Sequence, residues 1–152
     1  MASPQSSDKL LSNLAITQYD FDPDADTAVD VAWVDMRDFE NFAFSFFRTV
    51  GTSALDTVKI LANADSAGGG TDVEIKTWTN AAFGDPDAVG DYAFGECTAE
   101  EIAQEASDAG IANVRYVSVQ LEFATSTDEA VVTYVRGGAK RAYDGLSANS
   151  IA

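Results

Sequence analysis

Residues 38–50 constrain the fold of this chain most strongly, because they concentrate aromatic side chains at alternate positions. The stretch contains five of the nine phenylalanines, and Phe42, Phe44 and Phe46 alternate with smaller side chains. A period of two places these three rings on one face of an extended strand. Each buried ring contributes about 1.5–3 kcal/mol. We therefore expect a strand at 41–50 that forms one wall of a hydrophobic core.

A second region with clear alternation lies at 113–124. Its apolar face carries four side chains: Val117, Val119, Leu121 and Phe123. A short turn at 125–128 leads to an apolar run at 129–136, and two strands joined in this way are expected to pair as an antiparallel hairpin. Both faces of the second strand are partly apolar, which indicates a central strand or an interface strand.

Weaker strand patterns occupy 28–35, 55–62 and 72–78. Glycines and a proline mark 80–95 as a loop. One helix is predicted at about 98–109. Thr98 and Glu101 have the spacing of a capping box, and Gly110 is placed to end the helix.

These elements predict a mainly β fold, either an antiparallel β-sandwich or a jelly-roll-like barrel, with one α-helix at about 98–109. The predicted organisation is an N-terminal arm at 1–18, a single β-rich domain at 19–137 and a C-terminal tail at 138–152. At 152 residues, one domain is the expected number.

The charge balance argues against nucleic-acid partners. Nine Lys and Arg residues face 25 Asp and Glu residues, for a net charge of −16. Binding to phosphate backbones requires clustered cations, and a strongly negative protein repels polyanions. There is neither an apolar run long enough to span a membrane nor a signal-peptide pattern near the start, so we expect no membrane partner.

The residues for common catalytic chemistry are missing. The sequence has no histidine, which removes Ser-His-Asp and Cys-His nucleophiles and the usual imidazole zinc ligands. Cys97 has no second thiol and is expected to be a small buried hydrophobe. The glycines at 68–70 lack the spacing of a phosphate-binding loop. No pair of carboxylates is singled out for hydrolysis. We expect no enzyme activity and no cofactor.

Two ligand-binding alternatives remain open. The acidic stretch with Asp20, Asp22, Asp24 and Asp26 offers oxygen ligands for calcium, although it lacks the glycine and the glutamate of an EF-hand loop. A solvated acidic turn is the simpler interpretation. Trp33, Trp78 and Tyr92 could form a platform that stacks on sugars, although aromatic residues in a β domain usually belong to its core.

Two features indicate contact with a partner protein. Arg136, Lys140 and Arg141 bring three of the nine basic residues close together in an acidic chain, which suits an acidic partner or a second copy of the chain. Phe47 interrupts the small and polar face of the strand at 41–50. It is either a contact to a second layer or an exposed anchor for a neighbouring subunit.

The runs 44–65 and 116–136 resemble the capsid decoration (cement) proteins of tailed bacteriophages. The resemblance implies a β-rich virion protein, made in the host cytoplasm, that binds and stabilises the outer surface of the capsid. Its implied partners are the major capsid protein and further copies of itself, as a trimer or dimer. The chain lacks the Ala/Pro-rich docking tail that some of these proteins carry. A carbohydrate-binding β-sandwich module and a head-completion or tail structural protein are the alternative functions.

Overall fold

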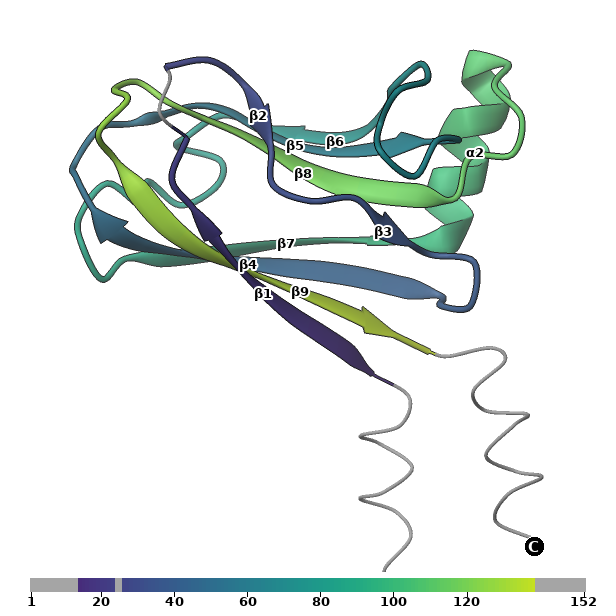
Figure 1. Cartoon of the computed structure of the whole chain (residues 1–152), viewed down its shortest axis with the longest axis horizontal. Helices are drawn as coiled ribbons and strands as arrows, with labels where there is room; N and C mark the ends of the chain where they lie inside the picture. Colours follow the sequence, from purple (N-terminus) through teal and green to yellow (C-terminus); the bar gives the residue numbers. More distant parts are fainter. Residues whose placement is uncertain (1–13, 24–25, 139–152) are drawn as a thin grey trace, which may run out of the picture.

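Two antiparallel sheets lie face to face in the computed structural model, which describes residues 14–23 and 26–138 (Figure 1). The four-stranded sheet has the order β1 (Ala15–Phe21), β9 (Glu129–Gly137), β4 (Asn41–Val50), β7 (Tyr92–Thr98). In the five-stranded sheet, β8 (Tyr116–Phe123) pairs with β2 (Val29–Asp30), β3 (Val34–Asp35) and β5 (Leu55–Asn63), and β6 (Val73–Trp78) pairs with β5. The predicted antiparallel β-sandwich is confirmed.

The alternating phenylalanines form the wall of the core that the sequence predicts. Phe42, Phe44 and Phe46 are 0%, 1% and 0% exposed. The apolar face of β8 packs into the same core with four side chains that are all fully buried: Val117, Val119, Leu121 and Phe123. Aromatic contacts join the two layers, since the rings of Phe46 and Phe123 lie 6.0 Å apart.

The predicted hairpin of β8 and β9 is wrong. The two strands follow each other in sequence, but β8 pairs with β5 and β9 pairs with β4 and β1. The connection at 124–128 therefore passes from one sheet to the other. A buried side chain attaches this connection to the four-stranded sheet, because Asp128 binds Arg48 of β4 at 2.7 Å. The central position predicted for the strand at 129–136 is confirmed.

The predicted strand at 28–35 is divided into β2 and β3. Between β2 and β3 the regular pairing with β8 is interrupted. A tyrosine from the opposite sheet forms hydrogen bonds with backbone groups there. The hydroxyl of Tyr134 accepts a hydrogen bond from the amide of Val119 and donates one to the carbonyl of Ala32, at 2.8 and 3.0 Å. Such a contact across the core has no local sequence pattern.

The region expected to be a loop at 80–95 ends in strand β7, which begins at Tyr92. Its pattern is the reverse of the usual one, because small residues face the core and aromatic residues face outward. At Gly95 the core leaves no room for a larger side chain. A Cβ added to Gly95 would lie 2.7 Å from both Phe44 and Trp78.

Strand β1 begins at Ala15, so residues 15–18 belong to the four-stranded sheet rather than to the predicted arm. Residues 1–13 of the predicted arm and residues 139–152 lie outside the described residues.

The helix α2 (Ala99–Ala109) confirms the prediction of its ends. The hydroxyl of Thr98 accepts from the amide of Glu101 and the carboxylate of Glu101 accepts from the amide of Thr98, while Gly110 closes the helix with φ of 70°. Ile102 and Ala106 are buried, whereas Ala103 is exposed. No helix within the described part of the chain has the length and apolar character to cross a membrane.

Candidate functional site

Three aromatic side chains gather on the outer face of the four-stranded sheet. Phe47 of β4 lies directly opposite Tyr92 of β7 in the strand register, and Phe94 lies one position further along on the same face. Side chains in such opposite and diagonal positions are close enough for aromatic rings to interact. We call Phe47, Tyr92 and Phe94 the aromatic patch.

The aromatic patch is open to solvent although its residues are large and apolar. The exposed fractions are 45% for Phe47, 73% for Tyr92 and 70% for Phe94. Val50 and Val89, at the same end of β4 and just before β7, are 41% and 60% exposed. Large rings exposed together on paired strands form a rigid apolar surface, which is typical of contact sites for other molecules.

The face around the aromatic patch is neutral to mildly acidic. On the neighbouring strand β9, Val131 pairs with Phe47 and Thr133 pairs with Ser45. Glu96 lies on the same face of β7, beyond Phe94. The patch is therefore an apolar area on one edge of the sheet, bordered by small and polar side chains.

Arg136, which the sequence placed with Phe47 among candidate partner-binding residues, lies elsewhere. It is opposite Phe42 in the register, and so faces the inner side of the sheet at its open end. Its guanidinium donates to the carbonyl of Asp35 at 2.7 Å and lies 4.8 Å from the ring centre of Phe39. Lys140 and Arg141 are outside the described residues.

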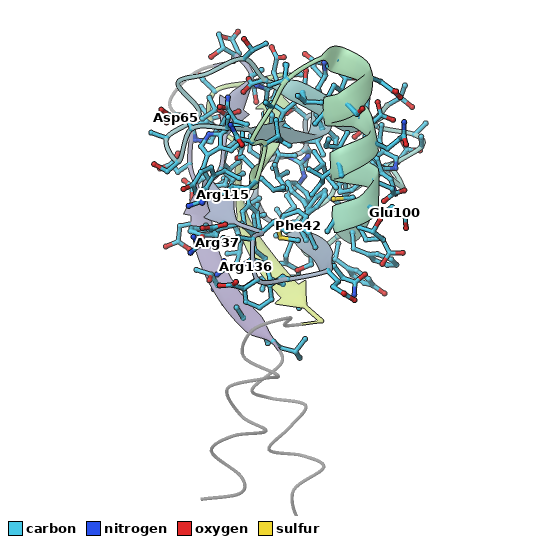
Figure 2. All side chains as sticks on the ribbon, turned by 90° about the vertical axis from the view of Figure 1, so that its right-hand side faces the viewer. Arg37, Phe42, Asp65, Glu100, Arg115 and Arg136 are labelled. Carbon is cyan, nitrogen blue, oxygen red and sulfur yellow. The ribbon has the colours of Figure 1, made fainter. Side chains whose placement is uncertain are left out.

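Arg37, Arg115 and Arg136 lie near one another on one side of the molecule (Figure 2), where all three contact Asp35. The carboxylate of Asp35 binds the guanidinium of Arg115 at 3.2 Å and the amide of Arg37 at 2.8 Å. The sequence did not indicate this cluster, because its members are separated by up to about a hundred residues. The cluster joins the loop after β3 to β8 and β9, which is a structural role.

A buried ionic site surrounds Arg48, which is 0% exposed. Its three nitrogen atoms donate to the carbonyl of Pro86 at 2.6 Å, to the carboxylate of Asp128 at 2.7 Å and to the carbonyl of Ser53 at 2.7 Å. The guanidinium also lies 5.0 Å from the ring centre of Phe123. Sequence reasoning missed this site, because an arginine inside a strand pattern gives no sign of its partner.

The carboxylate of Asp128 is fully engaged. Burial by itself would raise its pKa, but the hydroxyl and amide of Ser53, the hydroxyl of Thr125 and the guanidinium of Arg48 all stabilise the charged form and hold the pKa below its usual value. The site ties together connections of the fold.

The four aspartates considered for calcium do not form a site in the part that is described. Asp20 lies in β1, and Asp22 and Asp26 are exposed beyond it. Asp24 is outside the described residues. Within residues 14–23 and 26–138, no three Asp, Glu, His or Cys side chains are grouped so that they could hold a metal ion.

The aromatic residues considered for sugar stacking are separated. Trp78 is partly buried and packs against the core, with its ring centre 5.8 Å from that of Phe83 and 6.1 Å from that of Phe44. The indole of Trp33 donates to Asp30 at 3.3 Å on the other sheet. Only Tyr92 belongs to the aromatic patch.

Cys97 is 2% exposed, and burial followed by the nearby charge of Glu101 raises the pKa of its thiol to about 12. The expectation of a small buried hydrophobe at this position is in line with these values.

No protein-family model and no curated protein sequence matches the chain. Solved structures with a similar fold include a chain of the disulfide-linked pili of Bacillus endospore appendages, with 15% identity, a TM-score of 0.44 and coverage of 83% of this chain and 87% of the other. Others are the Yersinia pseudotuberculosis-derived mitogen (11%, 0.43, 83% and 86%) and the SPBc2 prophage-derived protein YomS (13%, 0.39, 82% and 95%). At such identities and TM-scores the likeness does not indicate a function.

Proposed function

We propose that this protein is a non-catalytic structural component of a tailed-phage virion, and that it attaches to the outer surface of the capsid through the aromatic patch. The observation that carries the proposal is the exposure of Phe47, Tyr92 and Phe94 together on one rigid sheet face. The virion assignment itself follows the resemblance of residues 44–65 and 116–136 to decoration proteins.

The energetics of aromatic side chains favour contact with another protein. Aromatic rings bury about 150–250 Å² each and dominate the energetics of interfaces. Tyrosine is one of the residues most often found at the centre of protein interfaces, where a single side chain contributes about 2 kcal/mol or more. Here the patch lies on the paired strands β4 and β7, so little conformational entropy is lost when a partner covers it.

The charge of the chain limits what the partner can be. With a net charge of −16, association with a second acidic surface is opposed by repulsion, and a neutral or basic rim around an apolar contact is favoured. The same charge keeps the protein away from packaged DNA. A capsid shell whose outer surface offers an apolar contact with a neutral or basic rim would suit a protein of this charge.

The test is to mix the purified protein with bare expanded capsids of the phage that encodes it and to examine them by cryo-electron microscopy and co-sedimentation. We expect saturable density on the outer shell. The double variant Tyr92→Ser/Phe94→Ser should weaken binding by about thirtyfold or more, the equivalent of one interface hot spot. Ile16→Ser is the matched control, because Ile16 is 61% exposed at the opposite edge of the same sheet.

The same experiment on complete virions separates the alternative functions. Density restricted to the neck or tail of the virion would indicate a head-completion or tail protein. Binding to a glycan array that is lost in the Tyr92→Ser/Phe94→Ser variant would indicate a carbohydrate-binding module. Absence of saturable density on the capsid shell would contradict the proposal.

A further inference from the structure

Strand β1 begins and strand β9 ends at the same end of the four-stranded sheet (Figure 1). A groove lies across this end of the sheet. Its floor follows the strand register, which places Gly137 of β9 opposite Asn41 of β4 and Asn41 opposite Thr98 of β7. Small and apolar side chains, Ala43 and Val135, contribute to the lining. We call this feature the end groove.

The far end of the end groove, at β7 and α2, is negatively charged. Glu96 and Glu101 line it, and Glu40 and Glu100 line the adjoining hollow at the start of α2. One cation, Lys76, lies among the described lining residues, and it is 3.3 Å from the carboxylate of Glu101. The charge of the lining therefore favours a basic occupant.

The near end of the end groove is where the described chain stops. Gly138 lines the groove, and its φ of 65° is a conformation that glycine adopts without strain. The next residues are Ala139, Lys140, Arg141 and Ala142. The basic pair Lys140 and Arg141 thus begins two residues after Gly138, which lines the groove.

The distances allow this segment to reach the acidic end. Strands β9 and β7 are separated by β4, so two strand spacings, about 10 Å, lie between them. Three extended residues span about 10 Å. Counted from Gly138, that length brings Arg141 to β7, beside Glu96 and the start of α2.

We propose that the end groove binds the segment that follows Gly138 in the same chain, with Lys140 and Arg141 paired to Glu96 and Glu100. Individual ion pairs at a surface are weak. The tether supplies an effective concentration in the millimolar range, which favours the chain's own segment over that of a second copy. The proposal does not depend on the capsid function.

The test is backbone NMR relaxation of the full-length protein at low salt. We expect order parameters near 0.8 at residues 140–143, and values below about 0.6 in Glu96→Lys/Glu100→Lys. The control Asp56→Lys/Glu105→Lys makes the same change in net charge at two exposed positions away from the groove and should leave the segment ordered. Unchanged amide shifts in the sheets verify that each variant is folded.

A charge exchange makes the test specific. Lys140→Glu/Arg141→Glu should release the segment, and combining it with Glu96→Lys/Glu100→Lys should restore its order. Order parameters below about 0.6 in the wild-type protein would overturn the proposal, as would an equal loss in the control variant. Loss of order on tenfold dilution would show that the bound segment comes from a second copy of the chain. That result would also overturn the proposal.

Discussion

Arg48→Met should destabilise the sandwich strongly, because Arg48 binds three connections that pass between the two sheets. Its guanidinium reaches Ser53 between β4 and β5, Pro86 between β6 and β7, and Asp128 between β8 and β9. Methionine keeps much of the apolar stem but removes every one of these bonds. The carboxylate of Asp128, which is 3% exposed as a residue, would then lack its cation.

The expected cost follows from the burial of the pair. Removing one partner of a buried ion pair typically costs about 3–5 kcal/mol, because it leaves an uncompensated charge in a poorly solvated site. In a domain of this size each kcal/mol lowers the melting temperature by about 2–4 °C. The melting temperature of Arg48→Met should therefore fall by about 6–20 °C.

The assay is thermal and urea unfolding at pH 7, with Lys59→Met as the matched control. Lys59 forms an ion pair of the same length, 2.7 Å, with Glu74, but the two side chains are 31% and 51% exposed. An exposed pair contributes about 0.2–1 kcal/mol, so the control should lose only a few degrees. A loss in Arg48→Met no larger than in Lys59→Met would refute the reasoning.

The pH dependence gives an independent test of the same pair. The pKa of Asp128 is lowered in the folded protein, so its contribution to stability is present above the unfolded pKa of about 4 and is lost as the pH falls through the folded pKa. The difference in stability between the wild-type protein and Arg48→Met should therefore narrow below about pH 4. A difference that stays constant from neutral pH into this range would contradict the ion pair as its source.

Two further outcomes are expected. Tyr134→Phe should cost about 1–3 kcal/mol in urea unfolding, because it leaves the amide of Val119 without its acceptor in the core; a cost near zero would show that this contact is dispensable. Cys97 should react with a thiol reagent at pH 8 only after unfolding, since its pKa of about 12 leaves almost no thiolate; rapid labelling of the folded protein would contradict the burial of Cys97.

The sequence by itself determined the class of fold and most of its elements. The alternation of Phe42, Phe44 and Phe46, and that of the residues 117–123, gives a period of two that only a strand satisfies, and both faces are buried as predicted. The helix at 98–109 was equally predictable from the sequence, because Thr98, Glu101 and Gly110 act on backbone groups within one or two turns. These signals depend only on residues close together in the sequence, so the sequence pattern contains them.

Only the tertiary structure decided which strands pair and what the surface presents. The strands at 116–123 and 129–137 belong to different sheets, and the connection between them is held by the contact of Asp128 with Arg48, a partner eighty positions away. Tyr92 and Phe94 face outward because Gly95 fits between Phe44 and Trp78 in the core. Phe47 was singled out from sequence as a possible anchor, but its neighbours Tyr92 and Phe94 come from a distant strand. Burial, register and the pairing of charges depend on contacts between remote residues, and a linear pattern does not contain them.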